Sequence, residues 1–266
     1  MSIPPIARTP YTSPAVSPSP LARRAPSLAF YPGMLRIIFQ AARLAKRGRY
    51  NKAEWIQSSL RTVAQLERVG VRLEIKGTEQ LTSLQYPCVF IANHMSTLET
   101  FVLPSLLRPH APLTFVVKRS LVTYPVFKHV MRSRDPIVVD RENPRADLKT
   151  VLEGGEQRLK NGISVVVFPQ STRSVRIDAQ QFNSIGIKLA RRAGVPVVPI
   201  ALKSDAWGAG RLIKDFGPID PKKTVHFHFG TPMQVHGNGK SEHQAVLAFI
   251  QERIETWLKQ DAAQGS

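Results

Sequence analysis

The stretch ISVVVF, residues 163–168, decides the fold class of this chain, because five of its six residues are apolar. A strand that helices cover on both faces carries such a continuous run, whereas a strand with one solvent-facing side alternates apolar and polar residues. Strands covered in this way belong to parallel sheets. We therefore expect residues 163–168 to form a central strand of a largely parallel sheet.

Short runs of the same β type recur on both sides of this strand, and helical patterns lie between several of them. The other expected strands cover residues 71–75, 88–92, 114–117, 137–139, 195–202 and 224–229. The expected helices cover residues 98–107, 121–131, 145–159, 181–192 and 242–259. Because strands and helices alternate, the pattern predicts an α/β fold with a largely parallel central sheet flanked by helices, assigned here to residues 70–266.

The first 69 residues carry a different pattern. Eight prolines lie between Pro4 and Pro32, which predicts a disordered Pro/Ser-rich tail over residues 1–33. A transit peptide and a true start at Met34 are the alternatives to a dispensable linker. Residues 34–69 predict two amphipathic helices. Their apolar faces either dock on an anionic membrane or pack on the α/β domain, or one helix does each.

The composition restricts the class of protein. The 266 residues include 37 Lys and Arg against 19 Asp and Glu, a net charge of +18, so we expect an anionic partner: nucleic acid, an anionic membrane or an acidic substrate. Hydrophobic residues make up 42% of the chain, which excludes a wholly disordered protein. No apolar run reaches the roughly 20 residues of a membrane-spanning helix. The single cysteine, Cys88, excludes an internal disulfide and a cysteine-rich zinc site.

The segment NHMSTLE, residues 93–99, directly follows the strand expected at 88–92. Sheets of this class place active-site groups at the carboxyl ends of their strands. His94 would lie in the turn and Glu99 early in the next helix, and a histidine beside a carboxylate is the arrangement of a general base. The alternative is an ordinary helix start, with Ser96 or Thr97 as the cap and His94 incidental.

Three further segments carry candidate side chains. FPQSTRS, residues 168–174, places small hydroxyl residues beside Arg173, which suits an oxyanion or a phosphate but also describes an ordinary turn. Arg141 follows the strand expected at 137–139 and either binds a phosphate or forms an exposed salt bridge. Two prolines within residues 195–202 predict a sheet edge, a bulge or a pocket wall rather than a regular ladder.

In this order, from Asn93 to Leu202, the four segments resemble the motif blocks of the glycerolipid acyltransferase family, which includes 1-acylglycerol-3-phosphate and lysophospholipid acyltransferases. The family pattern is Asn-His, four residues and Asp; a block ending in Arg; Phe-Pro-Glu-Gly-Thr-Arg; and Val-Pro-x-x-Pro. The chain departs from it with Glu99 for Asp, Gln170 for Glu and Ser171 for Gly. These departures concern the identity of the acceptor more than the type of reaction.

The resemblance implies a role for each matching residue. His94 would be the general base, and Glu99 the carboxylate that orients it. Arg141 and Arg173 would hold the acceptor phosphate. The residues implied in substrate binding are Asn93, Arg141, Gln170, Ser171, Thr172 and Arg173, and those implied in the acyl-donor pocket wall are Val195, Pro196 and Pro199. The family uses no metal and no cofactor, and acyl-CoA or acyl carrier protein is its co-substrate.

From the resemblance we expect a membrane-associated O-acyltransferase of phospholipid biosynthesis, peripheral on the cytoplasmic face of a membrane. It would move a fatty acyl group from the thioester to the hydroxyl of a lysolipid, first of all 1-acylglycerol-3-phosphate, to give phosphatidic acid. The alternatives are an acyltransferase for another lysolipid head group and a non-catalytic protein that binds anionic lipid or nucleic acid. No specific nucleic-acid partner is expected, because aromatic side chains are not interleaved with the basic stretches.

Overall fold

A single eight-stranded sheet runs through the computed structural model, which describes residues 3–8, 10–211 and 213–264. The strand order is β1-β2-β8-β7-β3-β6-β4-β5. The strands are β1 (Tyr11–Thr12), β2 (Leu73–Lys76), β3 (Val89–Ala92), β4 (Leu113–Lys118), β5 (Ile137–Val139), β6 (Ser164–Val167), β7 (Val197–Lys203) and β8 (Val225–Phe229). The five strands from β7 to β5 are mutually parallel, while β1–β2 and β7–β8 pair antiparallel. The expected largely parallel sheet is confirmed.

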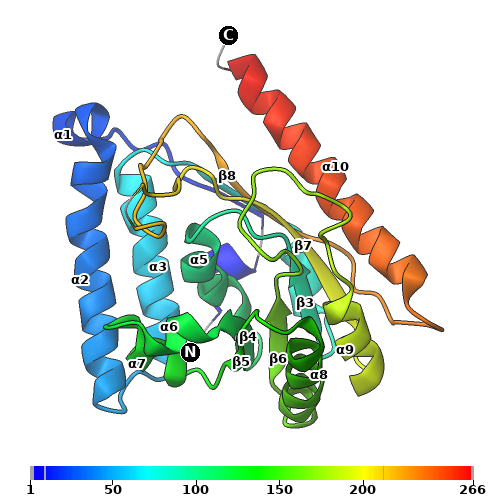
Figure 1. Ribbon diagram of the computed structural model, residues 1–266. Coiled ribbons are helices and arrows are strands. Elements are labelled where there is room, and N and C mark those ends of the chain that lie inside the picture. Colours follow the sequence, from blue (N-terminus) through cyan, green and yellow to red (C-terminus); the bar gives the residue numbers. More distant parts are fainter. Residues whose placement is uncertain (1–2, 9, 212, 265–266) are drawn as a thin grey trace.

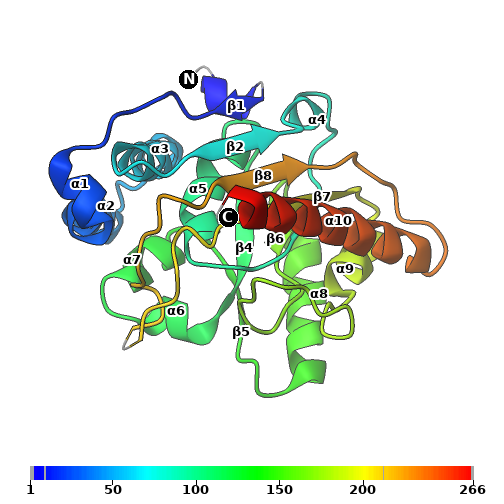
Figure 2. The ribbon, with the colours of Figure 1, turned by 90° about the horizontal axis from the view of Figure 1, so that it is seen from above.

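Helices cover both faces of this sheet (Figure 1). They are η1 (Pro5–Ala7), α1 (Pro20–Arg24), α2 (Pro26–Lys46), α3 (Lys52–Arg68), α4 (Glu79–Thr82), α5 (Leu98–Leu107), α6 (Arg119–Thr123), α7 (Phe127–Arg132), α8 (Pro144–Lys160), α9 (Ile185–Ala193) and α10 (Lys240–Gln264). Figure 2 shows α2, α3 and α5 on one side of the sheet and α8, α9 and α10 on the other. All four residues of β6 are buried, as expected of a doubly covered central strand.

The N-terminal segment is ordered, so the prediction of a disordered tail over residues 1–33 is wrong for residues 3–8 and 10–33; residues 1–2 and 9 lie outside the described part. Tyr11 pairs with Ile75 of β2, and its hydroxyl donates a 2.6 Å hydrogen bond to Glu67 Oε1. Helix α2 begins at Pro26 rather than residue 34, and Phe30 is fully buried edge-on against Trp207. These contacts span long sequence separations, and they outweigh the extended preference of a proline-rich chain.

Helices α2 and α3 differ in how much of their surface they bury. Helix α3 lies between α2 and the sheet (Figure 2) and buries Trp55, Val63 and Leu66. Asn51 caps it by accepting a hydrogen bond from the Glu54 N–H. Helix α2 packs on α3 with one face only. The packing of the pair on the α/β domain is therefore observed, and an outer face of α2 remains free.

Two details of the sequence pattern are corrected. Residues 121–131 form two short helices, α6 and α7, rather than one, because Pro125 cannot donate the hydrogen bond that would continue the first. The proline-containing block is not at a sheet edge, because β7 lies between β8 and β3. The Pro199 carbonyl accepts a hydrogen bond from the Gly230 N–H just beyond the end of β8, and the Pro199 nitrogen has no proton to return the second bond of that pair.

Candidate functional site

The candidate site forms where the parallel strands end. His94 follows β3, Gln170 follows β6 and Ser204 follows β7. Because β7, β3 and β6 are neighbours in the sheet and parallel, their carboxyl ends lie together at one edge. Arg141 follows β5 at the same edge. The topology therefore brings together segments that are more than 100 residues apart in sequence.

His94 and Glu99 form a hydrogen-bonded pair. His94 Nδ1 lies 2.8 Å from Glu99 Oε1, and the Glu99 side chain is fully buried while that of His94 is 13% exposed. Glu99 stands in the first turn of α5, as the sequence predicts. The carboxylate also accepts hydrogen bonds from the N–H groups of Met95 and Ser96, so it satisfies the helix start as well. The structure therefore shows both the contact between His94 and Glu99 and a role of Glu99 at the start of α5.

Glu99 stays ionised despite its burial. Burial alone would raise its pKa, but the hydrogen bond and charge of His94 and the hydrogen bond from Ser204 outweigh it, so the pKa of the Glu99 carboxyl lies below its ordinary value. A carboxylate oxygen can only accept, so His94 Nδ1 carries the proton. This leaves the lone pair of His94 Nε2 free, which is the tautomer that a general base needs.

The segment after β6 holds His94 in place from the other side. The Gln170 side-chain oxygen accepts a 2.7 Å hydrogen bond from the backbone N–H of His94, and the Ser174 N–H donates to the His94 carbonyl at 3.0 Å. Phe168 stacks on the imidazole with ring centroids 4.6 Å apart. The imidazole is therefore fixed by Glu99 at its edge, by Phe168 on its face and by backbone contacts at its Cα.

Arg141 and Arg173 bring two positive charges to the same edge. The Arg141 guanidinium donates to the Ser171 carbonyl, which ties the segment after β5 to the segment after β6. Burial lowers the pKa of Arg141, the nearby carboxylate of Asp147 raises it, and the positive charge of Arg173 lowers it further. Arg173 forms an ion pair with Asp215 at 2.7 Å. Two guanidinium groups that repel one another across a partly exposed surface suit a bound anion.

Asn93 does not face these arginines. Its side-chain amide donates to the Leu202 carbonyl at 2.8 Å and accepts from the Leu202 N–H at 2.9 Å. Asn93 is fully buried and joins the end of β3 to β7. The structure therefore gives this residue a fold-stabilising contact instead of the substrate contact that the resemblance implies. Ser171 and Thr172 are exposed beside Arg173.

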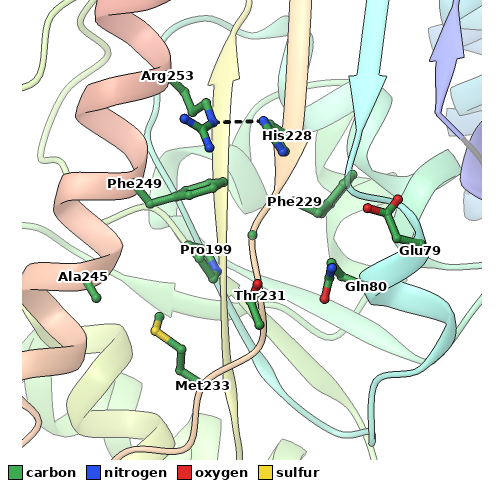
Figure 3. A pocket seen from close by; sticks show the side chains of 11 residues that line it. Glu79, Gln80, Pro199, His228, Phe229, Thr231, Met233, Ala245, Phe249 and Arg253 are labelled. Carbon is green, nitrogen blue, oxygen red and sulfur yellow. Dashed lines mark hydrogen bonds between the residues drawn. The ribbon is translucent and has the colours of Figure 1, made fainter.

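The residues implied in the acyl-donor wall lie away from His94. The Val195 N–H donates to the Ala190 carbonyl and the Pro196 carbonyl accepts from the Val89 N–H, both in backbone pairing. Pro199 lines an open pocket of about 370 Å³ between β7, β8 and α10 (Figure 3). Arg253 closes one end of this pocket and donates a 3.2 Å hydrogen bond to His228 Nδ1. Neither His94 nor Glu99 lines it.

His226 and Cys88, two buried titratable side chains away from His94, have structural surroundings. His226 stacks on Trp257 with centroids 4.8 Å apart, and burial lowers its pKa to about 3. Cys88 is buried in the core, and burial raises the pKa of its thiol to about 12, so it is a poor nucleophile. Among the described residues, no group of three or more His, Cys, Asp or Glu side chains is arranged to hold a metal ion.

Ser204 is a residue of the site that the sequence motifs do not indicate. Ser204 and Ser96 both place hydroxyls on Glu99 Oε2. Ser96 lies inside the segment quoted for His94, whereas Ser204 lies just past the proline-containing block. The feature of the sequence that could have indicated Ser204 is its position at the end of an expected strand.

Comparison with known proteins places the chain among acyltransferases. The model of the Acyltransferase family matches residues 72–203. A 1-acyl-sn-glycerol-3-phosphate acyltransferase of Pseudomonas aeruginosa is 33% identical over 228 residues, which cover 85% of this chain and 82% of the relative. A chloroplast 1-acyl-sn-glycerol-3-phosphate acyltransferase of Brassica napus is 32% identical over 142 residues, 53% of this chain and 39% of the relative.

The fold has a counterpart among solved structures. The crystal structure of the 1-acyl-sn-glycerophosphate acyltransferase of Thermotoga maritima superposes with a TM-score of 0.68 and 19% identity, covering 86% of this chain and 93% of that chain. At this identity the likeness concerns the fold.

Proposed function

The chain belongs to the glycerolipid acyltransferase family and is an acyltransferase. We therefore propose that it transfers an acyl group to 1-acylglycerol-3-phosphate, which gives phosphatidic acid, and that His94 is the general base. The observation that carries the proposal is the buried Glu99 carboxylate 2.8 Å from His94 Nδ1, at the edge where Arg141 and Arg173 gather. The names of the relatives support the acceptor.

The proposed reaction needs no covalent enzyme intermediate. His94 Nε2 takes the proton of the acceptor hydroxyl as its oxygen attacks the carbonyl carbon of an acyl thioester, and Glu99 stabilises the imidazolium. A tetrahedral intermediate forms, the carbon–sulfur bond breaks, and the leaving thiolate takes the proton from the His94 imidazolium, which restores the neutral base. Because a thioester is already activated, one base suffices. Acyl-CoA and acyl carrier protein carry the same reacting group, and an assay with each separates them.

The proposed acceptor site lies beside Arg173. Asp215 Oδ1 forms an ion pair with the Arg173 guanidinium at 2.7 Å and also accepts a 3.0 Å hydrogen bond from Thr97 Oγ1. An acceptor phosphate would compete with the Asp215 carboxylate for Arg173. The phosphate has the advantage of a larger charge and of Arg141 as a second partner.

We expect Arg173→Gln to raise KM for 1-acylglycerol-3-phosphate by roughly 10- to 100-fold, because a charged hydrogen bond contributes about 1.5–3 kcal/mol. The measurement is acyl transfer from a thioester to a panel containing this acceptor, a zwitterionic lysolipid and a phosphate-free lysolipid. KM for the phosphate-free acceptor should not change.

Lys188→Gln on α9 removes one exposed positive charge outside the site and serves as the control. Wild-type transfer only to another head group would keep the chemistry and overturn the proposed acceptor. An equal loss of transfer in Lys188→Gln would reduce the Arg173 effect to overall charge.

We further propose that the outer face of α2 lies on an anionic membrane. Leu28, Leu35 and Phe39 are exposed and spaced seven and four residues apart, so they share one face. The helix also carries Arg36 and Arg43 and has no acidic residue. Exposed apolar side chains beside basic ones favour the interface of an anionic bilayer. Within the described residues no helix is long and apolar enough to cross a membrane.

We expect the double variant Leu28→Ser, Phe39→Ser to bind vesicles of anionic phospholipid at least about tenfold more weakly, because insertion of a Leu or Phe contributes roughly 1.5–3 kcal/mol. Co-sedimentation with vesicles measures this. Activity on a short-chain, monomeric acceptor should stay at the wild-type level, which separates docking from folding. Unaltered vesicle binding would show that another surface contacts the lipid.

A further inference from the structure

Ser204 contacts the carboxylate behind the proposed base although it lies outside all four motif segments. It is the first residue after β7 and is fully buried. Its hydroxyl donates a hydrogen bond to Glu99 Oε2 and accepts one from Ser96 Oγ at 2.9 Å. A buried side chain cannot touch an acceptor on the surface, so any influence of Ser204 on the reaction passes through Glu99.

The two oxygens of Glu99 share the Ser96 N–H, at 3.0 and 3.1 Å, and otherwise have different partners. Oε1 accepts from His94 Nδ1 and from the Met95 N–H, each at 2.8 Å. Oε2 accepts from the Ser204 hydroxyl, and the Ser96 hydroxyl shares its one proton between Oε2 and Ser204 Oγ. The last torsion of a glutamate side chain is soft, so the plane of the carboxylate is set by its partners rather than by a rotamer preference. The Ser204 hydroxyl on Oε2 therefore acts together with the Met95 and Ser96 N–H groups to set where Oε1 points.

The contact between Glu99 and Ser204 also depends on the length of the Glu99 side chain. Glutamate is one methylene longer than the aspartate of the family pattern, and here its second oxygen reaches the end of β7. We propose that Ser204 is a positioning residue: its hydroxyl holds Glu99 Oε2 so that Oε1 faces His94 Nδ1. This inference rests on the proposed function of His94.

The test compares Ser204→Ala, Ser204→Cys and a control. Cysteine fills the volume of serine but donates weakly, so it separates the hydrogen bond from a cavity. We expect both variants to lower kcat by roughly 10- to 100-fold, the range for a hydrogen bond to a charged group, with little change in KM. Ser105→Ala removes another fully buried serine hydroxyl, on the helix that carries Glu99, and should leave kcat unchanged.

A second readout does not depend on activity. The Nδ1 proton of His94 should give a downfield proton resonance in the wild type, and in Ser204→Ala it should move upfield and exchange faster with water. In the Glu99→Asp background, where the shorter side chain loses its reach to Ser204, Ser204→Ala should have little further effect on either readout.

The outcomes are distinguishable. Wild-type protein without transfer to any acceptor would overturn the proposed function, while the resonance would still decide on Ser204. An unchanged resonance, or an unchanged kcat, would overturn the inference. Equal losses from Ser204→Ala in the wild-type and Glu99→Asp backgrounds would also overturn it, because Ser204 would then act independently of the carboxylate.

Discussion

His94→Ala should slow acyl transfer by roughly 10²- to 10⁴-fold, the contribution of a positioned general base, without unfolding the protein. Glu99 and Phe168 hold the His94 imidazole at the edge of the sheet where the parallel strands end. Steady-state transfer from a thioester to 1-acylglycerol-3-phosphate measures the loss. The Tm should fall because the buried Glu99 loses a partner, but the protein should stay folded, because the backbone contacts of residue 94 to Gln170 and Ser174 remain.

The matched control is His243→Ala. His243 is a half-buried histidine on α10 that contacts Phe182, outside the cluster around Glu99. It should transfer at the wild-type rate. Retained activity in His94→Ala would assign the base to another residue, and a general loss in both variants would point to folding instead.

The sequence predicted the sheet because its signal is local. All seven expected strands are present, within three residues at each end, since each is a short β-type run between turn residues. The N-terminal segment carries no such signal. Phe30 is ordered by Trp207, and Tyr11 by Glu67, and such long-range contacts are not encoded in a window of neighbouring residues.

The candidate site likewise has one part that the local sequence predicts and one part that depends on long-range contacts. The pair of His94 and Glu99 is local, because a strand end and one turn of helix bring the two together. Ser204 enters through strand order: β7 lies beside β3 although more than 100 residues separate them. Nothing in the spacing of the motifs states which strands are neighbours.

Gln170 shows how a departure from a family pattern gains its meaning from geometry. In sequence it removes a carboxylate from beside Arg173. In the structure its side-chain oxygen accepts the backbone N–H of His94. Glutamate and glutamine both offer such an oxygen, so the substitution keeps the contact that positions the turn.

Glu99→Gln should lower kcat by roughly 10²- to 10⁴-fold with little change in KM. Glutamine is neutral, so it cannot stabilise the imidazolium that forms when His94 takes the proton. Its amide N–H₂ group would also meet either the Ser96 N–H or the Ser204 hydroxyl, donor against donor, which disturbs the orientation of the ring. KM should hold because Glu99 is fully buried and has no access to the acceptor.

The same variant should change the acid stability of the protein. The pKa of Glu99 lies below its ordinary value of 4.5, so its stabilisation is complete above pH 4.5 and is lost as the pH falls through the lower folded value. Glu99→Gln should therefore flatten the fall of unfolding free energy in that acid range, as measured by urea denaturation at several pH values. Glu242→Gln, at a buried glutamate that accepts the His236 N–H at the start of α10, is the control and should keep full kcat. An unchanged kcat in Glu99→Gln would show that the carboxylate has no role in the reaction. Glu99 would then only stabilise the start of α5.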